Sequence, residues 1–244
     1  MMKKLTSPRV IEGLMARYGL HFNKRYGQNF LIDENILEKI VDVADIGPAD
    51  TVLEIGPGIG TLTQELAGRA KRVVTVEIDK KLIPVLKDTL ADRPNVEVIN
   101  RDFLKLTESE LAACFGSEAV KVVANLPYYV TTPIIMKLLE SPLTLSGMTF
   151  LVQKEVGQRI CAAPGKKIYG SLSIAAQYFA DPVIAFDVSA GVFMPRPKVD
   201  SIVITLQKRG MPPYIPKDQT LFFTLVRAAF LNRRKTLINS LSTN

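Results

Sequence analysis

The chain has 244 residues, enough for one large domain, and its 47% hydrophobic and 23% charged residues are typical of soluble globular proteins. Its apolar runs fall short of the roughly 18–20 residues that span a bilayer, and a net charge of +7 favours a polyanionic partner such as nucleic acid. One histidine, His21, and two cysteines, Cys114 and Cys161, argue against imidazole catalysis, a His-rich metal site and a disulfide framework, and favour a reducing cytosol.

The predicted elements alternate between helices and strands along the chain. Apolar residues at helical spacing predict a first helix after Asp33, which we expect to be its N-cap. TVLEIGPGIG at 51–60 then predicts a short buried strand that breaks into a glycine loop. Further strands are predicted at 72–79, 96–100, 121–126, 148–153, 183–188 and 201–207. Further helices are predicted at 61–67, 80–90, 107–114, 132–140, 154–161 and 172–179.

This alternation indicates an α/β fold. Because the strands are apolar throughout, we expect a mostly parallel sheet that is covered by helices on both faces. The strands at 183–188 and 201–207 are expected to close the sheet as antiparallel neighbours.

A domain boundary is predicted near the end of the last strand. The Pro-rich segment GMPPYIP at 210–216 is the best linker candidate, and a helix at 221–230 would begin a small second domain. We therefore expect a first domain over 1–209, which includes a basic N-terminal extension at 1–26, and a helical C-terminal domain over 210–244.

Three consecutive strand ends carry groups that a small ligand could use. Gly56 and Gly58 let the backbone turn sharply and approach a ligand, although a plain glycine turn is the alternative. Glu77 can accept hydrogen bonds from both hydroxyls of a ribose. Asp102 could bond an adenine amine, or act only as a cap or turn residue. This set of residues resembles that of S-adenosylmethionine-dependent methyltransferases. Their cofactor has no phosphates, so a G-x-G-x-G loop is expected in place of the G-x-G-x-x-G loop that binds dinucleotides.

The fourth strand ends beside these three, in VANLPYYV at 123–130. Read alone, Asn and Pro here indicate a turn. Beside a cofactor site, the Asn125 side-chain oxygen and a backbone carbonyl could accept both N–H bonds of an exocyclic adenine amine and direct its lone pair at a methyl group. Pro127 would fix the backbone and Tyr128 could stack on the base, whereas Tyr129 is expected only to pack. Positioning and electrostatics would then supply the rate, without a covalent intermediate.

Four ordered motifs carry a family resemblance over nearly the whole chain. They are G-Q-N-F-L at 27–31, E-I-G-P-G-x-G at 54–60, N-L-P-Y at 125–128 and F-x-P-x-P-x-V-x-S at 193–201. With the tail AAFLNRRKTLINSL at 228–241, they resemble the KsgA (RsmA) family of small-subunit rRNA adenine dimethyltransferases.

This resemblance implies roles for individual residues. It implies cofactor contacts from Asn29, Leu31, Gly56, Gly58, Glu77, Asp102 and Asn125. Asn125 would also touch the target amine, and Phe193 would supply a second stacking face opposite Tyr128. From the residues alone, Gln28 and Asn29 would be a turn leading into a helix, and Phe193 a core aromatic.

The implied function is dimethylation of N6 on each of two adjacent adenosines near the 3′ end of small-subunit rRNA, with S-adenosylmethionine as cofactor. The expected partner is the small-subunit rRNA or pre-30S particle, and we expect a cytoplasmic monomer without membrane contact. Arg196, Lys198 and 233–235 could contact RNA phosphates or only form a solvated face. The resemblance also implies a C-terminal domain of several helices, which we expect to be incomplete here.

Three alternatives remain. An Erm-type enzyme, which methylates large-subunit rRNA adenine, more often resembles N-I-P-Y and lacks the RRKTLxNSL tail. A non-catalytic relative in ribosome assembly or mitochondrial transcription would not need Asn125, Glu77 and Asp102 intact. A generic nucleotide-binding module would leave N-L-P-Y unexplained.

Overall fold

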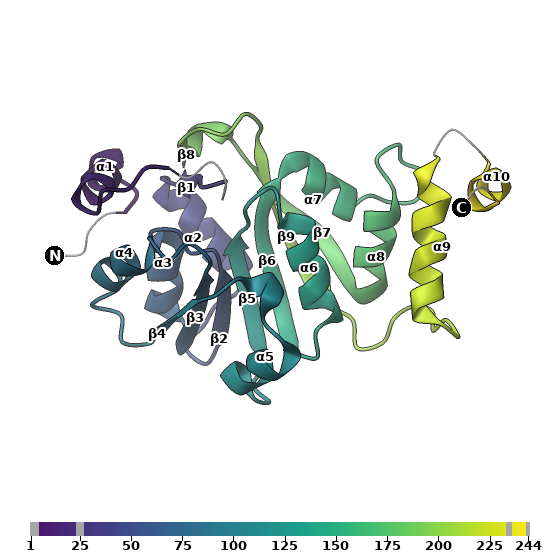
Figure 1. The fold of residues 1–244 in the computed structure, drawn as a ribbon, viewed down its shortest axis with the longest axis horizontal. Coiled ribbons are helices and arrows are strands. Elements are labelled where there is room, and N and C mark those ends of the chain that lie inside the picture. Colours follow the sequence, from purple (N-terminus) through teal and green to yellow (C-terminus); the bar gives the residue numbers. More distant parts are fainter. Residues whose placement is uncertain (1–4, 23–26, 233–235, 243–244) are drawn as a thin grey trace.

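Seven strands form one sheet in the part of the chain that the computed structural model describes, which is residues 5–22, 27–232 and 236–242. The strands lie in the order β4-β3-β2-β5-β6-β9-β7 (Figure 1). Their bounds are Thr51–Ile55 for β2, Arg72–Glu77 for β3, Val96–Asn100 for β4, Val120–Asn125 for β5, Leu145–Gln153 for β6, Ala180–Val188 for β7 and Ser201–Lys208 for β9.

The strand directions confirm the prediction of a mostly parallel, seven-stranded sheet. Strands β2, β3, β4, β5 and β6 pair in parallel, whereas β9 inserts between β6 and β7 and runs antiparallel to both. The first strand of the sheet, β2, is central, and the chain moves outward from it first through β3 and β4 and later through β5 and β6. The gap between the carboxyl ends of β2 and β5 is therefore the switch point where such sheets bind ligands.

Helices cover both faces of this sheet. Their bounds are Pro8–Arg17 for α1, Glu34–Val43 for α2, Thr61–Arg69 for α3, Ile83–Thr89 for α4, Glu108–Phe115 for α5, Thr131–Glu140 for α6, Lys154–Ile160 for α7, Ser171–Phe179 for α8, Gln219–Leu231 for α9 and Leu237–Leu241 for α10. The predicted N-cap is confirmed, since the Asp33 carboxylate accepts the Ile36 N–H at 3.1 Å. None of the helices in the described ranges is long and apolar enough to cross a bilayer.

Neighbouring strand residues point to opposite faces, which separates the core into two layers. Leu53 and Val122 pack in one cluster with residues of α5, α6, α7 and α8. Val52 and Val123 pack in a second cluster with residues of α2 and α3. Both faces are buried, which explains why these strands are apolar throughout.

Two short elements join motifs that lie far apart in the sequence. Phe30–Leu31 (β1) pairs antiparallel with Phe193–Met194 (β8), so the G-Q-N-F-L segment and the start of F-x-P-x-P form one small ribbon. The ribbon lies beside the top of α2 in Figure 1. The N-terminal region, expected only as a basic extension, also contains α1, whose buried residues pack against α4.

The C-terminal helices follow an irregular segment at 209–218. Helix α9 packs on α8 through a cluster of aromatic rings, in which Phe223 lies 5.2 Å from Tyr178 and 5.7 Å from Phe179 between ring centroids. None of its residues is fully buried, and Leu221 and Leu225 are exposed on it. This helix thus adds a layer outside α8 and away from the switch point (Figure 1).

Candidate active site

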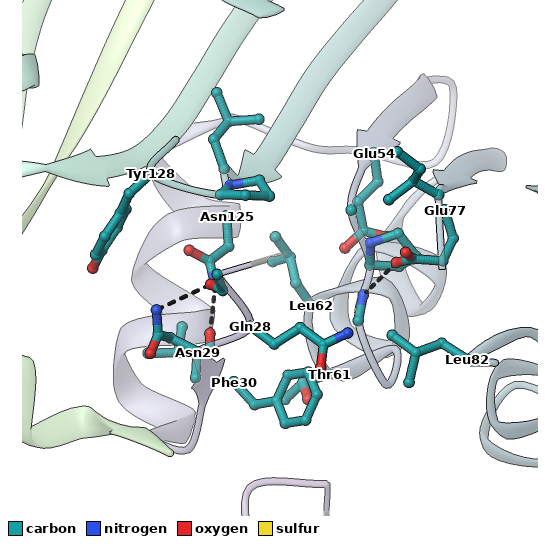
Figure 2. A pocket seen from close by; sticks show the side chains of 18 of the residues that line it. Gln28, Asn29, Phe30, Glu54, Thr61, Leu62, Glu77, Leu82, Asn125 and Tyr128 are labelled. Atoms are coloured by element: carbon teal, nitrogen blue, oxygen red, sulfur yellow. Dashed lines mark hydrogen bonds between the residues drawn. The ribbon is translucent and has the colours of Figure 1, made fainter. Parts of the chain in front are cut away.

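A cavity opens at the switch point of the sheet. It is lined from four parts of the chain: 27–31, the glycine loop after β2, the end of β3 and the turn 125–129 after β5. Figure 2 shows Asn125 and Tyr128 at one end of this cavity and Glu77 at the other. Eight of the ten predicted site residues line it: Asn29, Leu31, Gly56, Gly58, Glu77, Asn125, Pro127 and Tyr128.

The glycine loop has a backbone that other residues would strain. Gly56 and Gly58 have φ values of 72° and 61°, in the left-handed region that favours glycine. A Cβ on Gly58 would lie 2.9 Å from a ring carbon of Phe30. The glycine loop therefore packs tightly against Phe30 of strand β1.

Two buried carboxyl groups lie at the base of this loop. Glu77, only 4% exposed, accepts the Asp79 N–H at 2.7 Å and the Gly58 N–H at 3.3 Å. Burial nevertheless raises the Glu77 pKa to about 7, and these backbone bonds counter it only in part. Burial also raises the pKa of Glu54 to about 8, against the opposing hydrogen bond from Thr63 Oγ1 at 2.6 Å. Both groups thus hold protons near neutral pH more readily than exposed carboxylates.

The amide of Asn125 is oriented by the chain itself. Its Nδ2 donates to the backbone oxygen of Asn29 at 3.2 Å, and the Asn29 amide in turn donates to the oxygen of Gly27 at 3.1 Å. Because the nitrogen of Asn125 is used in this way, its Oδ1 is the atom left to accept a bond from a ligand in the cavity.

The turn that follows holds two tyrosines in different ways. The Tyr128 hydroxyl lies 2.7 Å from Ser201 Oγ, so its far end is tied to strand β9. Tyr129, which we expected to pack, is instead 54% exposed at the cavity rim, where its ring lies near Gly27. Pro127 also contacts the loop, since its ring lies 3.7 Å from where a Cβ of Gly56 would be.

Two predicted site residues do not line the cavity. Phe193 is 3% exposed and packs in the core cluster that also contains Leu31. Asp102 accepts the Leu104 N–H at 3.0 Å and so caps a single 3₁₀ turn, Phe103–Lys105. Their proposed contacts with the base and the cofactor therefore stay predictions.

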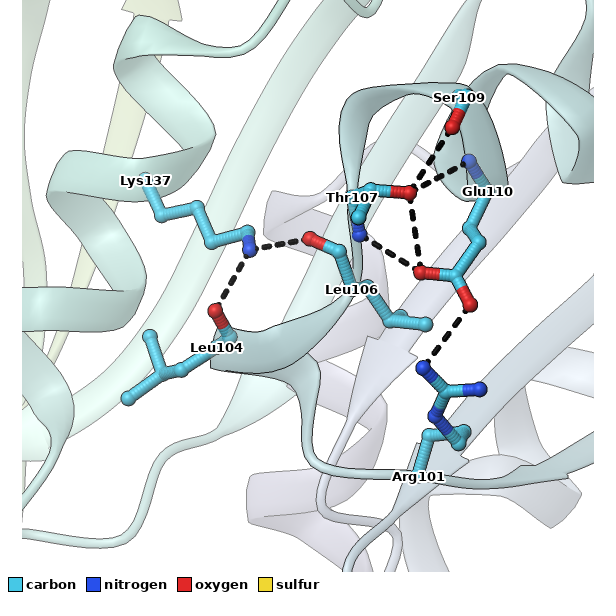
Figure 3. A network of polar contacts seen from close by, with 7 residues as sticks. All are labelled: Arg101, Leu104, Leu106, Thr107, Ser109, Glu110 and Lys137. Carbon is cyan, nitrogen blue, oxygen red and sulfur yellow. Dashed lines mark hydrogen bonds and ion pairs between the residues drawn. The ribbon is translucent and has the colours of Figure 1, made fainter.

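The turn after Asp102 is held at both ends (Figure 3). On one side, Lys137 of α6 donates to the backbone oxygens of Leu104 and Leu106, the former at 2.8 Å. On the other, Arg101 forms an ion pair with Glu110 at 2.9 Å, and Glu110 belongs to the capping box of α5. Helix α6 begins three residues after N-L-P-Y ends, at Thr131, so Lys137 connects the two segments.

Several lining residues were not predicted. Glu54 had a signal, because it is the one charged residue in the fully buried strand TVLEI. Ile78 had a weaker one: it follows Glu77 directly and is 40% exposed, which offers an apolar surface to a flat ligand. Gln28 donates to Asp79 at 3.2 Å, a contact between residues 51 positions apart that no local pattern indicates.

No cluster of three or more His, Cys, Asp or Glu side chains that could hold a metal is found among the described residues. The predicted RNA-contacting residues fall into two groups. Arg196 and Lys198 are exposed and line a groove together with Lys154 at the start of α7. The segment 233–235 lies outside the described residues.

The sheet order, the glycine loop and the carboxylate after the second strand define a Rossmann-like fold of the S-adenosylmethionine-dependent methyltransferase class. Residues 19–244 match the family described as Ribosomal RNA adenine dimethylase, and the chain belongs to that family.

Similar proteins agree with this membership. The chain is 54% identical over 242 residues to the Ribosomal RNA small subunit methyltransferase A of Alkaliphilus metalliredigens, covering 99% of this chain and 84% of that one. It is 52% identical to the protein of the same name from Geobacillus kaustophilus, covering 100% and 84%. Among solved structures, the 23S rRNA methyltransferase ErmE has a TM-score of 0.72 at 30% identity, covering 88% of this chain and 84% of ErmE. A dimethyladenosine transferase from Plasmodium falciparum has the same TM-score and identity, covering 88% and 75%.

Proposed function

We propose that this chain transfers methyl groups from S-adenosylmethionine to N6 of two adjacent adenosines near the 3′ end of small-subunit rRNA. The observation that carries the proposal is that one cavity at the switch point is lined by Glu77 of β3, the glycine loop after β2 and Asn125 of β5. The similarity to small-subunit methyltransferases at more than half identity supports the same substrate.

The cavity residues fit the cofactor. Glu77 can accept bonds from ribose hydroxyls, and the exposed side chain of Ile78 can cover one face of the adenine ring. The glycine loop lets the backbone approach the ligand because no Cβ stands in the way. When bound, S-adenosylmethionine supplies an electrophilic methyl group.

Asn125 holds the target amine in the proposed reaction. Its Oδ1 accepts one N–H, since its Nδ2 is bonded to Asn29. Of the two carbonyls that follow it, that of Pro127 already accepts Thr131 Oγ1 and the Val130 N–H, so that of Leu126 is the candidate for the second N–H. Two acceptors favour a pyramidal nitrogen whose lone pair is free to attack, and no covalent intermediate is needed.

The base itself is held outside its helix. Tyr128 is half-buried at the cavity and presents a ring on which an adenine can stack. Arg196, Lys198 and Lys154 line a neighbouring groove, where they contact phosphates of the flanking nucleotides. Lys154 also forms an ion pair with Asp187 at 3.1 Å, so it is less available to bind phosphate than Arg196 and Lys198.

The alternatives are less well supported. The similarity to ErmE would favour methylation of large-subunit rRNA. However, this chain is only 30% identical to ErmE, whereas it is 54% identical to a small-subunit methyltransferase. A role limited to binding would not require the Asn29–Asn125 bond that orients an acceptor into the cavity. We also propose that the protein acts as a monomer in the cytoplasm, with 1–209 as its methyltransferase domain and 210–244 as a linker followed by helices of a second domain.

The test uses labelled S-adenosylmethionine and ribosomal subunits from cells that lack this methylation. The protein is incubated in parallel with small and with large subunits, and label in each rRNA is counted. We expect label in the small subunit only. Label confined to the large subunit would sink the proposal in favour of the Erm-type function.

A further inference from the structure

Ser201 ends the F-x-P-x-P-x-V-x-S motif but has no role in the chemistry described so far. It is the first residue of β9 and is fully buried, with 0% of its surface exposed. Its backbone is paired with Gln153 of β6 on one side and with Val188 of β7 on the other. A residue paired on both sides inside a packed sheet has a fixed position.

Tyr128 lies outside the sheet. It belongs to the turn between β5 and α6, and its ring is half-buried beside the cavity. The only hydrogen bond described for its phenol joins it to Ser201 Oγ at 2.7 Å, across 73 residues of sequence. Burial raises the pKa of the phenol, so it stays protonated at neutral pH and the two hydroxyls share one donated proton.

We infer that Ser201 is a positioning residue that holds the Tyr128 ring in the orientation required to stack on the target adenine. The inference rests on the proposed function, which places the adenine against this ring. A phenylalanine ring would stack as well as a tyrosine ring, so stacking alone does not explain the hydroxyl. A hydrogen bond at the far end of the ring restricts both of its rotatable bonds, and it therefore presets the stacking surface before RNA arrives.

The kinetic test compares Ser201→Ala, Tyr128→Phe and the double variant on small subunits that lack the methylation. Each single change removes the same neutral hydrogen bond, so we expect kcat to fall by about five- to tenfold in each. The double variant should be no slower than either single one. KM for the subunit and the Kd of S-adenosylmethionine should change less than about twofold, because phosphate contacts away from the ring supply most of the affinity for the subunit and the cofactor lies at the other end of the cavity.

Ser173→Ala is the matched control. Ser173 is also fully buried, and its hydroxyl donates to the backbone oxygen of Arg159, but it does not line the cavity. We expect it to lower the thermal unfolding temperature about as much as Ser201→Ala while leaving kcat unchanged. A purely structural role for Ser201 predicts that both serine variants lose activity in proportion to their loss of folded protein.

Crystal structures of Ser201→Ala give a readout that does not need activity. The inference predicts that the Tyr128 ring occupies more than one rotamer in the variant and a single rotamer in the unchanged protein. An unchanged ring in Ser201→Ala, an unchanged kcat, or additive losses in the double variant would each overturn it. If the unchanged protein methylates no small subunit, the proposed function fails, and the crystallographic comparison still decides whether Ser201 positions the ring.

Discussion

Cofactor affinity should weaken as the pH falls through 7, because Glu77 must lose a proton to serve the ribose. The burial of Glu77 raises its pKa to about 7, whereas hydroxyl donors bind the ionised carboxylate. A carboxyl group whose pKa is raised in the free protein holds its proton below that pH. Binding therefore releases the proton, and affinity rises with pH until the carboxylate is fully ionised.

The size of the effect follows from the ionised fraction. With a pKa of about 7, roughly three-quarters of the Glu77 side chains are ionised near pH 7.5 and about 3% near pH 5.5. Because the apparent Kd scales inversely with the competent fraction, it should rise about 25-fold over this range. Calorimetry in two buffers of different ionisation enthalpy should show close to one proton released per cofactor near pH 6.

Two variants separate Glu77 from its neighbour. Glu77→Gln should bind more weakly but without the pH dependence, since an amide does not titrate in this range. Glu54→Gln should leave the pH dependence of the cofactor Kd unchanged. Burial raises the pKa of Glu54 to about 8, so this group is already neutral over most of the range from pH 5.5 to 7.5. A constant Kd between pH 5.5 and 7.5 in the unchanged protein, or a full slope in Glu77→Gln, would refute the reasoning.

Two further substitutions probe the walls of the cavity. Gly58→Ala places a Cβ 2.9 Å from an aromatic ring carbon at a φ of 61°. We therefore expect a loss of about 1–3 kcal/mol in the free energy of unfolding and weaker cofactor binding. Gly68→Ala is the control, because a Cβ there meets nothing and should not lower the free energy of unfolding. Denaturant titration and calorimetry check both, and equal stability of the two variants would contradict the strain. Lys137→Met removes two hydrogen bonds to the turn after Asp102, so it should lower the free energy of unfolding by about 1–3 kcal/mol. If that turn contacts the cofactor, the Kd of S-adenosylmethionine should also rise severalfold. Lys105→Met, an exposed lysine of the same turn, is its control, and matching effects from both lysines would contradict this role.

The sequence predicted the sheet well because its inner strands, such as β2, β3 and β5, are almost fully buried. Apolar runs such as TVLEI and RVVTVE are long enough to recognise, and their order along the chain determines which polar residues follow a strand. Since parallel strands end at one edge, Glu77 and Asn125 could be placed at the same edge of the sheet without coordinates, and both line the cavity. The resemblance to a family added Asn29 and Leu31, which have no such local signal.

Long-range contacts explain what the sequence did not reveal. The β1–β8 ribbon pairs Leu31 with Phe193. Each of its strands has only two residues, which is too short for a hydrophobic period to predict it. Ser201 reads as an ordinary strand residue until its bond to Tyr128 is seen. Helix α1 did carry a signal, since Ile11, Leu14 and Met15 are buried at helical spacing, but it was hidden within a basic segment.

The most direct test of the account is nucleoside analysis of small-subunit rRNA after reaction with the protein. The rRNA is digested to nucleosides and the modified adenosines are identified by mass spectrometry, for the unchanged protein and for Asn125→Ala. The account predicts N6,N6-dimethyladenosine with the unchanged protein and none with Asn125→Ala, although that variant still binds S-adenosylmethionine in calorimetry. Methylation at another atom of the nucleoside, or near-normal dimethylation by Asn125→Ala, would contradict it.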